Sequence, residues 1–202
     1  MSEIFFSQFG QDKWLDETVF RGKRNGIFVE AGALDGISDS NSAFFEKFRG
    51  WSGLLVEPNV VAFQMIGRNR PTTPAVCAAL YDRNGIVEFT LVSTAGWSGV
   101  ADDFEPQHKE RIAQSSRTSV TKVPCLTLYE AVTGLPRIDY LSLDLEGAEP
   151  TVLKPFPFNA MEIDVIGVEN NYGDERVQAI LGAAGYEKIG RVGPDDFYRR
   201  PQ

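Results

Sequence analysis

Four acidic residues stand where predicted strands end, next to runs of apolar residues. They lie at the carboxyl ends of the segments 27–31, 52–57, 138–144 and 163–169, and they are Glu30, Glu57, Asp144 and Glu169. In an open parallel sheet, ligands bind outside the carboxyl ends of the strands. A carboxylate at that edge can accept hydrogen bonds from hydroxyl groups, remove a proton or bind a hard cation. We therefore expect these acids to surround a ligand.

The first two acids frame a turn that contains two glycines. The apolar segment 27–31 runs into Gly32-Ala33-Leu34-Asp35-Gly36, and the next apolar segment ends in Glu57. This layout is typical of a nucleotide-binding strand–helix–strand unit, in which the acid after the second strand binds ribose hydroxyls. We expect Glu57 to bind ribose; capping of the following helix is the alternative.

The turn itself does not suit a pyrophosphate group. Leu34 stands where the Gly-x-Gly-x-x-Gly fingerprint of dinucleotide sites needs its second glycine, and Asp35 would repel phosphate at a helix N-terminus. An acidic turn suits a ligand with adenosine at one end and positive charge at the other, such as S-adenosylmethionine. Glu30 and Asp35 are expected to contact that charged end, although Asp35 could merely stabilise the turn. Gly32 is expected to allow close approach of the backbone.

Hydrophobic periodicity predicts alternating strands and helices. Strands are expected at 27–31, 52–57, 74–80, 138–144 and 163–169, and helices at 12–20, 39–48, 60–68, 127–132 and 174–184. Further extended segments are expected at 86–92, in a hairpin-like excursion, and at 119–125, and a terminal antiparallel hairpin from 186–192 and 197–200. This alternation predicts an α/β fold with a doubly wound, mostly parallel sheet.

Length, charge and composition narrow the possible partners. The 202 residues are predicted to form one domain, 1–202, and the net charge of −8 argues against nucleic acid or an anionic membrane as the main partner. No apolar run approaches the roughly 20 residues that cross a bilayer, and the N-terminus lacks the pattern of a secretory signal. Cys77 and Cys125 are expected to be reduced core thiols in a cytoplasmic protein.

The polar segment 93–119 is predicted to be an irregular substrate loop, because loops of that length in compact domains are usually functional or mobile. It contains Trp97, which could stack on a sugar ring or pack the loop down. It also contains His108, the only histidine of the chain. His108 could lie at the surface, or it could act as a base if the loop folds over the pocket.

Several motifs carry a resemblance to a known family. They are SQFGQD at 7–12, VEAGALDG at 29–36, SNS at 40–42, LVEPN at 55–59 and IDYLSLDLEGAE at 138–149. Together they resemble the FkbM family of methyltransferases, over nearly the whole chain. The resemblance implies a class I methyltransferase (Rossmann-like) fold. It also implies S-adenosylmethionine as cofactor, S-adenosylhomocysteine as product, and O-methylation of a hydroxyl, often on a sugar or natural product.

The resemblance also implies a set of cofactor contacts. The N-terminal segment 1–26 is expected to close over the cofactor, with helix capping as the alternative role of Asp12. The predicted cofactor-binding residues are Gln8, Gln11, Asp12, Glu30, Gly32, Asp35, Asn41, Glu57, Pro58, Ala78 and Asp144.

Methylation of a hydroxyl requires that the acceptor oxygen be aligned with the methyl group and lose its proton. Asp144 is the predicted central catalytic residue, together with Glu146 and His108. A divalent cation such as Mg²⁺ is the other route to activation, as in catechol O-methyltransferase-like enzymes. Its predicted ligands are Asp144, Glu169 and Asn170, an oxygen-only set that suits a hard cation.

Two further functions stay open. One is a non-catalytic binding module that retains the fold. The other is a nicotinamide-dependent oxidoreductase, which the acidic turn and the missing glycine disfavour. The acceptor is expected to be a small hydroxyl-bearing molecule that contains carbohydrate.

Overall fold

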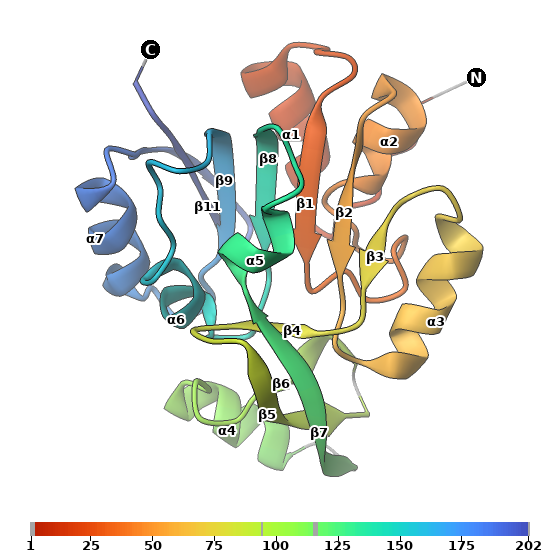
Figure 1. Cartoon of the computed structure of the whole chain (residues 1–202), viewed down its shortest axis with the longest axis vertical. Coiled ribbons are helices and arrows are strands. Elements are labelled where there is room, and N and C mark those ends of the chain that lie inside the picture. The colour runs from red at the N-terminus through yellow and green to blue at the C-terminus, as the bar shows by residue number, and fades with distance from the viewer. Residues whose placement is uncertain (1–2, 94, 115–116, 202) are drawn as a thin grey trace.

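The computed structural model describes residues 3–93, 95–114 and 117–201 and places their strands in two sheets. A seven-stranded sheet forms the centre of the molecule. A four-stranded sheet lies beneath the carboxyl ends of the central parallel strands (Figure 1). The edge at which the acids were expected therefore faces a second layer rather than open solvent.

The central sheet has the strand order β10-β11-β9-β8-β1-β2-β3. β11 runs antiparallel to both β9 and β10, and the other pairs are parallel. The predicted doubly wound, mostly parallel sheet with a terminal hairpin is confirmed. Its strands are β1 (Ile27–Ala31), β2 (Ser52–Val56), β3 (Ala75–Val76), β8 (Ile138–Leu143), β9 (Ile163–Glu169), β10 (Glu187–Val192) and β11 (Asp195–Arg199).

Helices cover both faces of this sheet, which is why its strands are almost wholly apolar. On one face, Val29 and Leu141 belong to a core cluster with residues of α5 (Leu128–Val132), α6 (Glu149–Leu153) and α7 (Glu175–Ala183). On the other face, Phe28 and Tyr140 pack with residues of the π-helix η1 (Leu15–Phe20), α2 (Ala43–Arg49) and α3 (Val60–Asn69). A short helix, α1 (Gln11–Trp14), precedes η1. Burial on both faces leaves the strand ends as the place for polar residues.

The helix expected at 39–48 begins only at Ala43. The reason lies in the three residues before it, whose groups bind the Glu30 carboxylate. Ser40 and Ser42 donate their hydroxyls to it, and Asn41 donates its backbone N–H. Gly50 ends the helix in the left-handed conformation, as the sequence predicted.

The prediction of one strand over 74–80 is wrong. The segment divides into β3, which pairs with β2, and β4 (Ala79–Tyr81), which pairs with β7 of the second sheet. Both halves are extended, so the local pattern is the same, but each half pairs with a strand of a different sheet. Cys77 lies in the break and is partly buried, whereas Cys125 is buried as expected.

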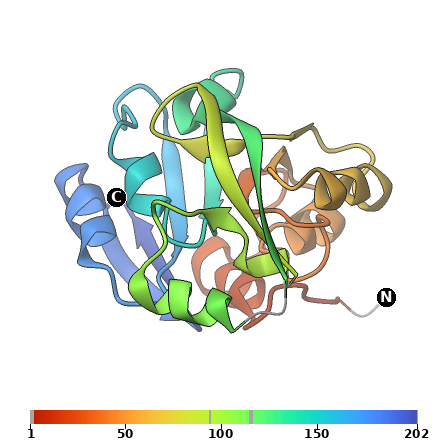
Figure 2. The same ribbon diagram turned by 90° about the horizontal axis from the view of Figure 1, so that it is seen from below.

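The second sheet has the order β4-β7-β5-β6, with β5 (Gly85–Val92), β6 (Gly99–Val100) and β7 (Thr118–Thr127). β5 pairs antiparallel with β7 over its whole length, from Gly85 opposite Cys125 to Val92 opposite Thr118. The extended excursion is confirmed, but its main partner is the distant β7. Figure 2 shows this sheet from below, with β5 and β7 in front of the central strands.

The segment 93–119 is more regular than predicted. It contains a 3-10 turn, η2 (Ala95–Trp97), the short strand β6, and the helix α4 (Pro106–Ala113). Pro106 stands at the start of α4, where its fixed φ and missing N–H are tolerated. Residues 94, 115 and 116 lie outside the described residues. Among the described residues, no helix is both long enough and apolar enough to span a membrane.

Candidate active site

Three pockets lie at the carboxyl ends of the central strands, and the largest pocket of these three lies between the two sheets, at the ends of β1, β2 and β8. It encloses about 590 Å³, open solvent at its mouth included. Gly32 and Glu57 line it from the central sheet, Phe89 from the second sheet, and Asp144 with Glu146 from the turn after β8. The pocket is therefore closed by elements far apart in the sequence.

Two smaller pockets adjoin the largest one. One encloses about 300 Å³ and is lined by Gly32, Asn41, Ser142 and Asp144 among others. The other encloses about 340 Å³ and is lined by Glu146 together with Glu149, Glu169, Asn170 and Tyr172. Asp144 borders the largest pocket and the pocket beyond Gly32, which is the one with Asn41 and Ser142. Glu146 borders the largest pocket and the pocket with Glu149 and Glu169, which we call the acidic pocket. These two acids thus stand at the junction of three spaces.

Gly32, directly after β1, packs against the backbone directly after β8. Its φ of +83° is left-handed, and a Cβ there would lie 2.0 Å from the backbone oxygen of Asp144. Any side chain at this position would overlap backbone that cannot move without disturbing β8. The glycine is therefore required by close packing as well as by its φ.

We expect Gly32→Ala to be at least about 2 kcal/mol less stable than the wild type, from the left-handed φ and the overlap together. Urea unfolding measures this change. Gly182→Ala is the matched control, because Gly182 lies in α7 with open space around its Cβ position. That variant should be as stable as the wild type or slightly more so. Equal stability of the two variants would contradict the close packing at Gly32.

Glu57 joins the turn after β1 to the turn after β2. Its carboxylate accepts the backbone N–H groups of Leu34, at 2.8 Å, and Asn59, at 2.7 Å. Leu34 adopts a left-handed φ of 48°. Helix capping, the alternative role of Glu57, is performed by Asn59, whose side chain accepts two N–H groups of α3. Burial raises the pKa of Glu57 to about 7.

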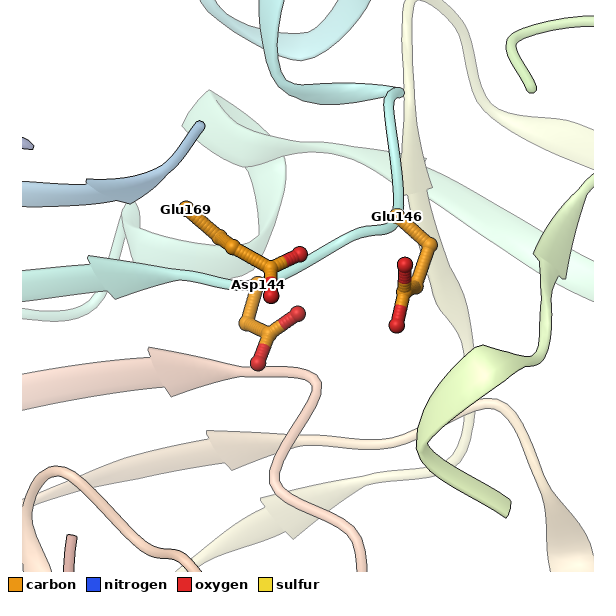
Figure 3. Close-up of side chains that lie close together, drawn as sticks. All are labelled: Asp144, Glu146 and Glu169. Atoms are coloured by element: carbon orange, nitrogen blue, oxygen red, sulfur yellow. The ribbon is translucent and has the colours of Figure 1, made fainter. Parts of the chain in front are cut away.

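Asp144, Glu146 and Glu169 form an acidic cluster, in which one carboxylate oxygen of each lies within 4.8 Å of the others. Figure 3 shows the Asp144 and Glu169 carboxyl groups facing each other, with Glu146 pointing toward them from the turn after β8. Burial, and then the neighbouring acids, raise the pKa of Asp144 well above its usual range and that of Glu146 to about 9. Burial also raises the pKa of Glu169. These shifts all favour the protonated forms of the three carboxyl groups.

The turn that carries Glu146 is held by Glu149. The Glu149 carboxylate accepts the backbone N–H groups of Leu145, at 2.7 Å, and Gly147, at 3.0 Å. Glu146 itself has a left-handed φ of 55°, which is uncommon for a residue with a side chain. Strained backbone of this kind is concentrated at functional sites, where the surrounding structure enforces it.

His108 is buried, which contradicts the surface alternative. Its Nε2 lies 3.1 Å from the backbone oxygen of Trp97, and its Nδ1 lies 3.2 Å from Glu146 Oε2 and 3.3 Å from the Tyr172 hydroxyl. Burial lowers the pKa of His108. Trp97 packs within the same segment, with the Arg111 guanidinium 4.0 Å from its ring centre. The segment 93–119 thus brings His108 to the acidic cluster. This is the arrangement that the prediction of His108 as a base required.

The sequence matches the model of one protein family, described as the methyltransferase FkbM domain, over residues 30–188. The chain belongs to the FkbM methyltransferase family. The match contains the turn after β1, Glu57 and the whole acidic cluster. No curated protein matches the sequence at a significant level.

Solved structures show the same fold at low sequence identity. An FkbM methyltransferase from Methylobacillus flagellatus KT has a TM-score of 0.55 and 11% identity, over 87% of this chain and 43% of its own. A precorrin-6y C5,15-methyltransferase from Geobacter metallireducens GS-15 has a TM-score of 0.51 and 11% identity, over 98% and 90%. A TehB-like SAM-dependent methyltransferase from Corynebacterium glutamicum ATCC 13032 Kitasato has a TM-score of 0.50 and 10% identity, over 96% and 89%. The FkbM domain therefore has the class I methyltransferase fold, and it spans less than half of the first of these structures.

Part of the predicted cofactor set lines the pockets of this FkbM domain. The largest pocket is lined by Pro58 and Ala78 in addition to Gly32, Glu57 and Asp144. Asn41 and Glu30 line the smaller pocket beyond Gly32. Glu30 is only 4% exposed, and its carboxylate is occupied by the loop after β1. The observed role of Glu30 is to anchor that loop, and contact between Glu30 and a ligand stays a prediction.

Asp35 lines neither the largest pocket nor the smaller one beyond Gly32. Its carboxylate accepts the backbone N–H groups of Ile37 and Ser38 and the Ser38 hydroxyl. Burial would raise the pKa of Asp35, but these hydrogen bonds outweigh it and lower the pKa. Stabilisation of the turn is thus the role that the described contacts support.

The N-terminal residues lie beside the site without lining the described pockets. Asp12 is fully buried, and its carboxylate accepts the N–H of Phe6 and both the N–H and the hydroxyl of Ser7. Gln11 donates to the Asp195 carboxylate at 3.2 Å, and Gln8 is exposed. Ser7 forms a parallel β-bridge with Asp39. This bridge places the N-terminal segment against the loop after β1, where closure over a cofactor stays a prediction.

The acidic cluster differs from the predicted metal set in one member. The Asn170 side-chain oxygen accepts the N–H of Asp174 at 2.6 Å, and its amide group donates to Asp196 at 3.1 Å. These bonds tie Asn170 to the loop before α7 and to β11. Glu146 lies beside Asp144 and Glu169, and metal binding by the predicted set with Asn170 stays a prediction.

Three residues near the site escaped the sequence analysis. Arg70 is fully buried, donates to Glu46 and Ser42, and stacks over Phe28, so it ties α3 to the loop after β1. No local pattern distinguishes it from a surface arginine. Arg111 had a signal, since it lies three residues after His108 and thus on the same helix face. Ser142 had one too, because it precedes Asp144 by two residues on β8 and so shares its side of the strand.

Proposed function

We propose that this FkbM domain transfers the methyl group of S-adenosylmethionine to a hydroxyl group of a small acceptor. The observation that carries the proposal is the set of three adjoining pockets around Asp144 and Glu146. The largest suits the nucleoside, the pocket beyond Gly32 suits the amino-acid end, and the acidic pocket suits the acceptor. The reacting atoms would then meet at the junction, beside Asp144.

The residues of the largest pocket suit S-adenosylmethionine. Glu57 stands at the end of β2, where its carboxylate can accept hydrogen bonds from ribose hydroxyls in addition to those from the turns. Leu34, Phe89 and Val100 provide apolar walls for an adenine ring. Gly32 leaves room because it has no side chain, and the acidic cluster favours a cationic ligand. When bound, S-adenosylmethionine supplies a methyl group on a positively charged sulfur, which is a good leaving group.

The protein must still remove the proton of the acceptor hydroxyl. Asp144 and Glu146 border the junction, and each has a carboxyl pKa raised by burial, which makes the carboxylate a stronger base once it is ionised. Glu169 hydrogen-bonds with Asp144 and provides a second position for the proton. We assign Asp144 the role of catalytic base, with Glu146 next to it.

The acceptor pocket contains groups that suit a carbohydrate. Glu149, Asn171 and Tyr172 line it together with Glu146 and Glu169. Carboxylate, amide and phenol groups offer hydrogen bonds in the number that sugar hydroxyls require. Aromatic rings provide apolar contact for the face of a sugar. A hydroxyl-rich acceptor therefore suits this pocket better than an apolar one.

The direct test is calorimetry with S-adenosylmethionine, S-adenosylhomocysteine and NAD. We expect both adenosyl ligands to bind and NAD not to bind, because the turn after β1 lacks the second glycine and carries Asp35. Binding of NAD alone would support the oxidoreductase alternative. Transfer of a tritiated methyl group from S-adenosylmethionine into a metabolite extract then separates an enzyme from a non-catalytic binding module.

A divalent cation at Asp144, Glu146 and Glu169 is the alternative route to activation. The neighbours of these groups argue for base catalysis, since Glu146 faces His108 and Asp144 shares a hydrogen bond with Glu169. We expect EDTA to leave methyl transfer unchanged, as measured by S-adenosylhomocysteine formation. Loss of activity with EDTA and its recovery with Mg²⁺ would establish the cation instead.

Stability should fall with rising pH because of the buried acids. The folded-state pKa values of Glu57, Glu149 and Glu146, about 7, 8 and 9, lie above the ordinary 4.5. The folded protein therefore binds more protons, and this contribution to stability is lost as pH rises from about 4.5 through 9. We expect the melting temperature to fall between pH 6 and pH 9, and Glu146→Gln to weaken this dependence.

Ligand binding provides the matched comparison for this pH dependence. At equal ligand concentration, the rise in melting temperature with S-adenosylmethionine relative to that with S-adenosylhomocysteine should be larger at pH 9 than at pH 6, because only the former carries the sulfonium charge that the ionised acids attract. A melting temperature that rises from pH 6 to pH 9 in the wild type would show that other groups dominate.

A further inference from the structure

His108 is fully buried and lines none of the three pockets, although it lies beside the acidic cluster. Its ring packs on Phe104, with the two ring centres 4.6 Å apart. An acceptor molecule in these pockets therefore does not touch the imidazole. Any part that His108 takes in methyl transfer has to act through a neighbour that does line a pocket.

The hydrogen bonds of the imidazole fix which of its nitrogens carries the hydrogen. Nε2 lies 3.1 Å from the backbone oxygen of Trp97. A carbonyl oxygen can only accept a hydrogen bond, so Nε2 is the donor and carries the hydrogen. In the neutral ring, Nδ1 is then bare and needs a donor of its own.

Two groups face Nδ1. Glu146 Oε2 lies 3.2 Å from it and the Tyr172 hydroxyl 3.3 Å. Glu146 Oε2 is buried and accepts no hydrogen bond from the described residues. If Glu146 were ionised beside a neutral imidazole, two lone pairs would face each other without a hydrogen between them, which is costly in a buried site. A single hydrogen between Oε2 and Nδ1 satisfies both atoms.

The surroundings favour Glu146 over Tyr172 as the source of this hydrogen. Burial raises the pKa of Glu146 and lowers the pKa of His108, so both shifts favour a hydrogen on the carboxyl group. Tyr172 is partly exposed, and water can accept from its hydroxyl. Buried Oε2 has no such substitute.

We infer that His108 is the positioning residue of Glu146: Nδ1 accepts the hydrogen of Oε2, which leaves Oε1 as the oxygen that serves the pockets. The inference rests on the proposed function, in which the acceptor binds beside Asp144 and Glu146. Glu146 lines both the largest pocket and the acidic pocket, so an orientation imposed on its carboxyl group acts directly on both spaces. Oε1 then accepts a hydrogen bond from the acceptor molecule, and Asp144 takes the proton.

The first test uses the protein without a ligand. His108 is the only histidine of the chain, so untagged protein labelled with ¹⁵N-histidine gives one pair of ring-nitrogen signals. At pH 7 we expect Nε2 to be protonated, and Nδ1 to be unprotonated with its signal moved upfield by a hydrogen bond. Glu146→Gly, which suits the left-handed φ of 55°, should move the Nδ1 signal downfield.

Two matched variants identify the donor. Glu146→Gln, whose amide can donate to Nδ1, should keep most of the upfield displacement. Tyr172→Phe should leave both nitrogen signals close to those of the wild type.

The second test measures methyl transfer. His108→Leu should lower kcat by about three- to tenfold, the value of one hydrogen bond, and leave S-adenosylhomocysteine affinity within about twofold of the wild type. His108→Asn, whose amide oxygen can accept in place of Nδ1, should recover part of the lost rate. A merely structural role would weaken S-adenosylhomocysteine binding as well, because the segment that carries His108 lines the largest pocket through Gly96, Ser98 and Val100.

The outcomes separate this inference from the proposed function. If the wild type neither binds S-adenosylhomocysteine nor transfers methyl groups, the proposed function fails, and the role of His108 fails with it. If the wild type is active, an Nδ1 signal that is the same in folded Glu146→Gly, or that loses its displacement in Tyr172→Phe, overturns the inference alone. A doubly protonated ring in the wild type, or equal losses of kcat and S-adenosylhomocysteine affinity in folded His108→Leu, would overturn it as well.

Discussion

Asp144→Asn should lower the rate of methyl transfer by about 10²- to 10⁴-fold, the usual contribution of a general base. Asparagine keeps the size of the side chain and removes the group that takes the proton. S-adenosylhomocysteine should still bind, because Glu57 and Gly32, the proposed cofactor contacts, are unchanged. The measurement is S-adenosylhomocysteine formation with the acceptor found by methyl labelling, beside calorimetric affinity for the product.

Asp139→Asn is the matched control at the opposite end of β8. Asp139 accepts the backbone N–H of Ile27 at 2.7 Å and pairs with Lys23, so its loss should lower stability. It lies away from the three pockets, and its variant should transfer methyl groups at the wild-type rate per folded molecule. Full activity of Asp144→Asn would contradict both base catalysis by this residue and a catalytic cation bound to it.

Glu57→Ala should weaken the binding of S-adenosylmethionine and S-adenosylhomocysteine by about 1–3 kcal/mol, through loss of charge-assisted hydrogen bonds to two ribose hydroxyls. It should weaken 5′-methylthioadenosine, a nucleoside that lacks the amino-acid end, to the same extent, since every one of these ligands contains the ribose. Calorimetry with the three ligands measures this pattern directly.

The Glu57 carboxylate also holds the N–H groups of Leu34 and Asn59, so the variant must be shown to be folded. Glu57→Gln provides that comparison, because the amide oxygen can still accept one of the two bonds. Circular dichroism and the melting temperature report on the fold. Unchanged affinity in folded Glu57→Ala would place the ribose elsewhere and contradict the role assigned to the end of β2.

The segment 93–119 makes several contacts around the acidic pocket, which is the proposed acceptor pocket. His108 reaches Glu146, and Glu105 pairs with Arg176 of α7. Gly147 lies so close to this segment that a Cβ there would be 2.6 Å from the backbone oxygen of Asp103. The acceptor pocket is therefore shaped by the excursion between the two halves of the central sheet. The same segment also lines the pocket proposed for the nucleoside, through Gly96, Ser98 and Val100.

Local signals in the sequence were enough for the central sheet and the cofactor end. The apolar runs at 27–31, 138–144 and 163–169 became β1, β8 and β9 almost residue for residue, because strands buried on both faces admit little else. The glycine turn predicted a close approach, and the structure shows it at Gly32. Glu57 lines the largest pocket for an equally local reason, since it directly follows an apolar strand.

Only the tertiary structure decided the second sheet and the surroundings of the acidic cluster. Whether 74–80 is one strand or two depends on β7, whose residues lie more than 35 positions away in the chain. His108 is buried because α4 packs against the turn after β8, and its own neighbours in the sequence are polar. Glu146 lies beside Asp144 and Glu169, and the Asn170 side chain is bonded to Asp174 and Asp196. Each of these outcomes depends on pairing between distant segments, and a local pattern contains no information about which distant partner a segment will meet.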